Sequence, residues 1–194
     1  MTKVSQFDGM KLLETDRLVI RPFVLGDAAM FRRLLDEAFG HESSGAEDTT
    51  RILLEYNVIA DKAHEALHQT PYGDRAIVLK SDGSLIGAVG FAPCLAPFGR
   101  LRSFRGAPHR SAEVGLFWAL FPEHWGRGYA TEAARAMVSY GFDELELGRI
   151  VATTENDNLR SIAVMKRLGM TLERNPSDEP HWFQTVGVLV NPAA

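Results

Sequence analysis

The sequence has one cysteine, no long apolar run and no excess of basic residues. Because Cys94 stands alone among 194 residues, the chain cannot form an internal disulfide, and we expect a reducing compartment. A membrane-spanning helix needs about 18 consecutive apolar residues, and no stretch of this sequence comes close to that length. Residues 1–11 lack the apolar region of a signal peptide and are expected to form a flexible segment. These absences favour a cytoplasmic protein without a membrane partner.

The charge balance disfavours nucleic acid as the partner of the chain as a whole. The formal net charge is −4, whereas proteins that bind nucleic acid usually carry a positive surplus. Hydrophobic residues make up 45% and charged residues 24%, as in ordinary soluble globular proteins. At this length we expect one domain, residues 1–194, with a core large enough to fold alone.

Periodic patterns alternate between strand and helix along the chain. Strands are expected at 17–22, 75–79, 85–91, 113–120, 149–154, 171–174 and 182–190. Helices are expected at 27–39, 49–70, 128–144 and 158–168, with a polar loop at 41–48. The helix at 128–144 would join the strands 113–120 and 149–154 as a right-handed parallel crossover. The pattern predicts an α/β fold.

The most specific motif follows the strand 113–120. Gly126 and Gly128 stand one residue apart where that strand gives way to a helix. Such a turn points several main-chain N–H groups at one place, which suits phosphate oxygens. Ligands of parallel sheets lie beyond the carboxyl ends of the strands, so Asn158 is expected at the same edge. The spacing therefore predicts a cofactor that contains a pyrophosphate.

Two other motifs suggest different chemistry. His64, Glu65 and His68 match H-E-x-x-H, which on a helix would place two histidines on one face for zinc. The expected helix ends almost at once, and no third ligand is evident. Gly126 and Gly128, with Glu155 as a ribose ligand, suggest a dinucleotide fold. Thr131 replaces the third small residue of that fingerprint, which disfavours it.

The segment 93–112 is rich in positive charge and contains no acidic residue. Four arginines and one histidine alternate with Phe98 and Phe104, and three prolines and two glycines predict a loop. A long loop between strands is often functional. We expect either a solvated surface loop or a flap over an anionic substrate or cofactor. Stacking of RNA bases on its aromatic and arginine side chains is a minority alternative.

The order of motifs resembles the GNAT acetyltransferase superfamily, and within it the ribosomal-protein N-terminal acetyltransferase (RimJ/RimL-like) branch. The resemblance covers about residues 12–190. Its motifs are Leu13–Pro22, Trp125–Ala133, Glu155–Ser161, Lys166–Met170 and His181–Phe183. It implies a mixed sheet of about seven strands, splayed between the fourth strand (113–120) and the fifth (149–154), with about four helices. Dimers occur in this branch.

The resemblance also implies contacts with acetyl-CoA. Main-chain groups of the fourth strand would hold the pantetheine arm and the acetyl carbonyl, and the glycine loop would bind the pyrophosphate. Asn158 would hydrogen-bond the pantetheine, and Ser161 would lie close to the cofactor sulfur. The implied main-chain contacts are those of Trp118, Ala119, Leu120, Gly126, Arg127, Gly128, Tyr129, Ala130 and Thr131.

The implied reaction transfers acetyl directly from the thioester to an amine. Glu113 is our choice for the base, with a salt-bridged carboxylate as the alternative and His124 as a weaker candidate. Ser161 or a water would supply the acid, because Met165 stands where many relatives have tyrosine. Trp125 likewise replaces the usual Gln or Arg at the start of the loop. Cys94 as an acetyl carrier is disfavoured.

The acceptor is not encoded in a motif that we can interpret. Members of the branch acetylate protein N-termini, antibiotics, polyamines and other small amines. The acceptor pocket is expected to involve the first two helices, the segment 93–112 and the final hairpin. The arginines suggest an anionic feature on the acceptor. A CoA-binding regulatory module without catalysis is the alternative function, and acetylated product would separate the two.

Overall fold

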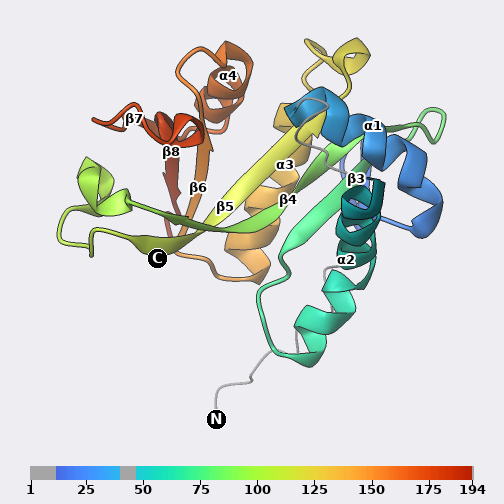
Figure 1. Ribbon diagram of the computed structural model, residues 1–194, viewed down its shortest axis with the longest axis horizontal. Coiled ribbons are helices and arrows are strands. Elements are labelled where there is room, and N and C mark those ends of the chain that lie inside the picture. The colour runs from blue at the N-terminus through green and yellow to red at the C-terminus, as the bar shows by residue number, and fades with distance from the viewer. Residues whose placement is uncertain (1–11, 40–46, 194) are drawn as a thin grey trace. The chain divides into compact units, whose positions relative to one another are not determined.

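The computed structural model describes residues 12–39 and 47–193 (Figure 1). The predicted flexible segment 1–11, and most of the loop expected at 41–48, lie outside the described residues. The chain divides into two compact units, which are described separately below. Unit 1 comprises Met1–Gly90 and Trp118–Tyr129, and unit 2 comprises Phe91–Phe117 and Ala130–Ala194. None of the described helices has the length and apolar character that crossing a membrane requires.

The strands form one mixed sheet in the order β1-β2-β3-β4-β5-β6-β8-β7. They are β1 (Leu13–Glu14), β2 (Leu18–Pro22), β3 (Gly73–Leu79), β4 (Leu85–Ala96), β5 (Ser111–Leu120), β6 (Arg149–Thr154), β7 (Thr171–Arg174) and β8 (Thr185–Val190). The sheet has one strand more than expected, because the two-residue β1 is too short for a periodic signal. The expected parallel pair is confirmed in β5 and β6, whose register joins Gly115 to Val151.

In unit 1 one helix packs against the antiparallel pair β2 and β3, and a second helix packs against the first. The helices are α1 (Ala28–Phe39) and α2 (Glu47–Ala66), and α2 lies along β3 (Figure 1). The alternating residues Leu18 and Ile20 of β2 are fully buried. Phe23 packs edge-on against Phe31 of α1, with ring centroids 4.9 Å apart. Burial of this apolar face is the main stabilising term of the unit.

The chain enters α1 through a capped 3-10 turn at Leu25–Asp27. The Asp27 carboxylate accepts the main-chain N–H of Val24 at 2.9 Å and two hydrogen bonds from Arg21 at 2.7 and 2.9 Å. Burial opposes ionisation, but the hydrogen bonds from Arg21 and Val24 prevail and lower the pKa of Asp27. The residue expected to cap α1 therefore caps the turn that precedes it.

Unit 2 is built on the antiparallel strands β6, β8 and β7. Helix α4 (Leu159–Arg167) packs against all three (Figure 1). The helix expected at 128–144 is α3 (Tyr129–Ser139), which continues as a π-helical turn at Tyr140–Glu144. Strand β4 runs on to Ala96 and β5 begins at Ser111, so the loop predicted at 93–112 is shorter than expected.

Candidate active site

The glycine loop has the main-chain geometry that its sequence predicts. After β5 the chain makes a 3-10 turn at Pro122–His124 and enters α3 at Tyr129. Gly126 has a φ of 73° and Gly128 a φ of 83°, values that residues with a Cβ rarely adopt. A Cβ on Gly126 would meet nothing within 4 Å, so the backbone conformation, and not crowding, requires glycine there. The first N–H groups of a helix have no acceptor within the helix, so the start of α3 is a position that suits an anion.

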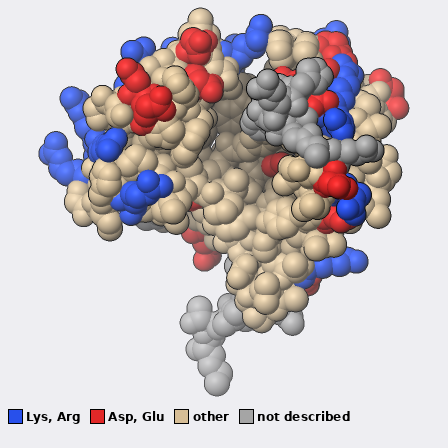
Figure 2. Space-filling view, viewed as in Figure 1, with Lys and Arg blue, Asp and Glu red and all other residues tan. Residues whose placement is uncertain are grey.

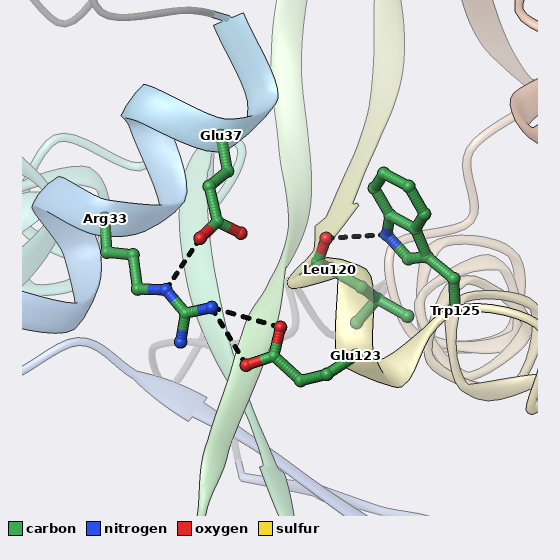
Figure 3. Close-up of polar contacts among 5 residues, drawn as sticks. All are labelled: Arg33, Glu37, Leu120, Glu123 and Trp125. Atoms are coloured by element: carbon green, nitrogen blue, oxygen red, sulfur yellow. Dashed lines mark hydrogen bonds and ion pairs between the residues drawn. The ribbon is translucent and has the colours of Figure 1, made fainter.

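Trp125 closes the turn that leads into this loop. Its indole Nε1 donates a hydrogen bond to the carbonyl oxygen of Leu120 at 2.8 Å (Figure 3). The residue that replaces the usual Gln or Arg therefore ties the loop to the end of β5. Leu120 was expected to offer main-chain groups to the cofactor, and its carbonyl already has this partner.

A second set of contacts holds the same turn to α1. Arg33 donates to both carboxylate oxygens of Glu123, at 2.9 and 3.0 Å, and to Glu37 at 2.7 Å (Figure 3). Its guanidinium also lies 4.2 Å from the ring centroid of the buried Phe121. A hydrogen bond to its own main-chain N–H, followed by those from Arg33, lowers the pKa of Glu123. Arg33 thus joins the first helix to the start of the glycine loop.

Arg17 is a functional candidate that the sequence analysis did not single out. It donates to the carbonyl oxygen of Arg127 at 3.1 Å, and its guanidinium lies 4.5 Å from the centroid of the Tyr129 ring. Its Nη2 is 3.4 Å from the position of a Cβ built on Gly128. A cation therefore lies beside the N-terminus of α3, where two positive features favour an anion.

In unit 2, Asn158 is the N-cap of α4. Its side-chain oxygen accepts the N–H of Ser161 at 3.1 Å, so its amide nitrogen is the group that could donate to a ligand. The turn before it is fixed to β8. Gln184 accepts the main-chain N–H of Asn156 at 3.0 Å, and the hydroxyl of Thr185 donates to the Asn156 side chain at 2.8 Å. Half-buried Ser161 lies in the first turn of α4.

A cleft of about 390 Å³ also lies in unit 2. Three strands and the 3-10 turn His181–Phe183 supply its walls. Gly115 of β5 is the parallel partner of Val151 of β6, and both residues line the cleft. The short pairing of these two strands agrees with the splay expected between them. The lining residues are Ala92, Pro93, Cys94, Leu95, Gly115, Leu116, Phe117, Val151, Ala152, Thr153 and Trp182.

Comparisons with known proteins agree with this geometry. Residues 17–171 match the family described as Acetyltransferase (GNAT) domain. The uncharacterized N-acetyltransferase YoaA of Bacillus subtilis is 32% identical over 163 residues, which is 84% of each chain. The chain belongs to the GNAT acetyltransferase family. It is therefore an acyl-CoA-dependent N-acetyltransferase.

Solved structures share the fold. A crystal structure of an acetyltransferase from Agrobacterium tumefaciens superimposes with a TM-score of 0.69 at 25% identity, covering 97% of this chain and 99% of that one. RimL, a ribosomal L7/L12 alpha-N-protein acetyltransferase solved with coenzyme A, gives a TM-score of 0.62 at 14% identity. The superposition covers 95% of this chain and 100% of the RimL chain. At this level of identity, the similarity shows a shared fold and nothing more.

Within this GNAT domain, the proposed base Glu113 is held in an ion pair. Arg149 donates to both of its carboxylate oxygens at 2.9 Å, and the hydroxyl of Ser111 adds a third bond at 3.0 Å. The Glu113 side chain is only 10% exposed. To accept a proton it would have to give up part of this pairing, so the geometry favours the salt-bridged alternative. The role as base stays a prediction.

Cys94 and Met165 are unsuited to covalent or acid chemistry. Burial, followed by the negative charge of Glu113, raises the pKa of the Cys94 thiol to about 11. The thiolate needed for an acetyl carrier is therefore scarce at neutral pH. Met165 is fully buried and packs against Gly187 of β8, where a Cβ would come within 3.1 Å of its sulfur. The acid, where one exists, is expected to be Ser161 or a water.

The zinc alternative is not supported by the helix that carries it. Helix α2 ends at Ala66, and His68 follows it with a φ of 53°. His64 and His68 therefore lack the common helical face that the motif requires. His64 is buried, with its ring between those of Tyr56 and Tyr72 at 6.3 and 6.2 Å. Among the described residues, no three His, Cys, Asp or Glu side chains gather as a metal site.

The basic segment is anchored in unit 2 by buried phenylalanines, and its role as a flap stays a prediction. We call residues 97–110 the arginine platform. Its Phe98 and Phe104 are buried with ring centroids 4.9 Å apart, in one cluster with Phe183. Glu173 accepts the N–H groups of Arg102 and Ser103 at 2.6 and 2.9 Å. The arginines at 100, 102, 105 and 110 are exposed, and basic side chains gather over this segment (Figure 2).

Proposed function

We propose that this enzyme transfers acetyl directly from acetyl-CoA to a primary amine, a protein N-terminus or a small amine, in a ternary complex. Membership of the GNAT family supports acetyl transfer. The observation that carries the cofactor assignment is the pair of glycines with positive φ directly before α3. We assign the diphosphate to the main-chain N–H groups of residues 126–131, and the pantetheine to Asn158 and to β5 at 118–120.

The reaction forms one C–N bond and breaks one C–S bond. The amine must be neutral when it attacks the thioester carbonyl, and it loses a proton as the amide forms. The departing thiolate of coenzyme A gains a proton. Main-chain N–H groups near the acetyl carbonyl would stabilise the oxyanion of the tetrahedral intermediate. The side chains of Glu113 and Ser161 are our candidates for base and acid, and a water can serve in either place.

Other parts of the assignment follow from the resemblance. Assignment to the RimJ/RimL-like branch, a homodimer and a cytoplasmic location stay predictions. For the branch we expect a protein or peptide N-terminus among the acceptors. Mass spectrometry of a cell extract incubated with the enzyme and acetyl-CoA would identify the acetylated product. A CoA-binding module without catalysis would yield none.

The glycine loop can be tested with a matched pair of variants. Gly126→Ala and Gly83→Ala impose the same backbone strain, because the two φ values are 73° and 74° and neither Cβ would meet an atom within 4 Å. The strain costs about 1 kcal/mol in each case. We expect calorimetry to show about tenfold weaker binding of coenzyme A to Gly126→Ala and unchanged binding to Gly83→Ala. Equal affinities would remove the diphosphate from this loop.

A further inference from the structure

We propose that the acceptor is a primary monoamine with an apolar or aromatic substituent, which binds in the cleft of unit 2. The inference rests on the proposed acetyl transfer and names the class of its acceptor. It excludes polyamines, which the sequence analysis left open. Three features of the cleft carry it: the chemistry of its lining, the exposed rings and chains at its rim, and the charges next to it.

The lining of the cleft carries no charged side chain. None of its eleven lining residues, all within the described ranges, is an acid or a base. Cys94 is uncharged near neutral pH because burial raises the pKa of its thiol to about 11. The only other polar side chains are the Thr153 hydroxyl and the Trp182 indole N–H. Such a lining binds apolar groups, with a few polar atoms left to orient the amine.

Two large apolar side chains at the cleft are exposed to solvent. The exposed fraction is 58% for Leu95 and 45% for Trp182. The Trp182 ring lies 5.7 Å from that of Phe183, which is fully buried against Phe98 at 5.1 Å. The indole is therefore held in place by the core. An exposed and rigid aromatic ring beside a neutral cleft is typical of a site that binds an apolar ligand.

The charges next to the cleft oppose a polycation. Arg110 donates to the carbonyl oxygen of Leu95 at 3.4 Å, which places a positive charge beside the rim. Glu113 acts electrostatically on Cys94, but both of its oxygens are paired with Arg149. The second ammonium group of a polyamine would lose hydration without gaining a carboxylate. A monoamine avoids this cost because its one nitrogen is neutral when it reacts.

The first test compares three amines as acceptors of the full-length enzyme. Release of free coenzyme A is measured with acetyl-CoA and phenethylamine, ethylamine or spermidine. We expect kcat/KM for phenethylamine to exceed that for each of the other two by about tenfold, because only phenethylamine can bury a ring. A kcat/KM for spermidine equal to or above that for phenethylamine would overturn the proposal.

Substitution of the rim gives the second test. We expect Trp182→Ala to raise KM for phenethylamine about tenfold and to leave KM for ethylamine within about twofold. Trp182→Phe should retain most of the affinity. Leu67→Ala removes another exposed apolar side chain, just after α2, and serves as the control. If Trp182→Ala raises KM equally for both amines, Trp182 has a structural role and the proposal is contradicted.

A third variant adds a negative charge to the rim of the cleft and leaves Trp182 unchanged. Leu95→Glu places a carboxylate at the rim, so we expect KM for spermidine to fall by about fivefold and KM for phenethylamine to rise. Leu67→Glu adds the same charge elsewhere. If Leu95→Glu leaves both KM values unchanged, the cleft does not hold the acceptor.

Failure of this inference can be distinguished from failure of the proposed function. If no amine is acetylated and calorimetry detects no coenzyme A, the cofactor assignment itself is wrong. If coenzyme A binds and spermidine is the preferred acceptor, acetyl transfer stands and the acceptor class proposed here is wrong.

Discussion

The glycine loop and the cleft of unit 2 recognise their ligands by opposite means. The loop offers main-chain N–H groups at the start of α3, with the cation of Arg17 beside them, and carries little side-chain chemistry of its own. The side chains that line the cleft are almost all apolar, and none of them is charged. The first arrangement suits a ligand whose charge never varies, such as a diphosphate. The second suits a neutral group and discriminates by the absence of counter-charges.

The two regions also differ in how they are kept in shape. Short polar contacts hold the loop: the indole of Trp125 on Leu120, Arg33 on Glu123 and Arg17 on Arg127 (Figure 3). Burial and one ion pair hold the surroundings of the cleft, where Phe183 packs in a cluster of buried residues and Glu113 pairs with Arg149. Substitutions should therefore affect cofactor affinity in the first region, and acceptor choice or stability in the second.

The largest effect that we expect concerns the chemistry of the cleft. Because burial raises the pKa of Cys94 to about 11, its thiolate fraction at pH 8 should be about 100-fold below that of an exposed cysteine. Alkylation by iodoacetamide should be correspondingly slow. Its rate should rise about tenfold per pH unit without a plateau below about pH 11. Mass spectrometry measures the rate, and a plateau near pH 8.5 would show that the Cys94 thiol is not shielded from solvent as described here.

The next effect concerns the frame of the cleft. Glu113→Gln removes one partner of an ion pair whose side chains are 10% and 35% exposed, so we expect the free energy of unfolding to fall by about 2 kcal/mol. Thermal denaturation would show this as a loss of about 4–8 °C. Glu14→Gln, which breaks the more exposed pair with Lys80, should cost less than about 0.5 kcal/mol.

The same variant tests the role of Glu113 as a base. If Glu113 has a structural role only, the pH profile of kcat/KM measured for Glu113→Gln should keep its acidic limb. Unchanged thermal stability, with turnover slowed by about two orders of magnitude or more and loss of that limb, would instead make Glu113 the base.

A smaller effect is expected at the loop. Arg17→Ala removes the cation beside α3 and its bond to the Arg127 carbonyl, so coenzyme A should bind about tenfold more weakly while KM for the acceptor stays unchanged. Arg17→Lys retains the charge and should recover part of the affinity. Arg51→Ala removes an exposed arginine of α2 as a control for net charge. If Arg17→Ala and Arg51→Ala bind coenzyme A with equal affinity, Arg17 does not contribute, and the loop binds the cofactor through main-chain groups alone.

A region of this protein is predictable from the sequence when the residues that form it are close together along the chain. The glycine loop was predictable because Gly126, Gly128 and the start of α3 are neighbours in the chain, and their conformations are local. The same holds for β6, whose predicted bounds 149–154 are those observed, and for the start of the helix after Asn158. Arg17 was missed because 110 residues separate it from Arg127, and no local pattern marks such a contact.

The cleft could not be predicted, since its walls come from residues as distant as Ala92 and Trp182. The burial of Phe98 and Phe104 was missed for a related reason. They lie in two three-residue 3-10 turns, which carry no periodic signal, and their packing partner Phe183 comes much later in the chain. Arginines and prolines around them correctly indicated a loop, but they gave no sign that two of its side chains are buried.

The smallest effect that we expect lies outside both regions, on the arginine platform. Replacing Arg100, Arg102 and Arg105 with alanine removes exposed charges only, so coenzyme A affinity and kcat/KM for phenethylamine should stay within about twofold. A peptide with an N-terminal phenylalanine followed by acidic residues should show a raised KM, and in the unsubstituted enzyme that KM should rise with salt. If the peptide and phenethylamine respond alike, the platform has no part in choosing the acceptor, and the neutral cleft alone sets specificity.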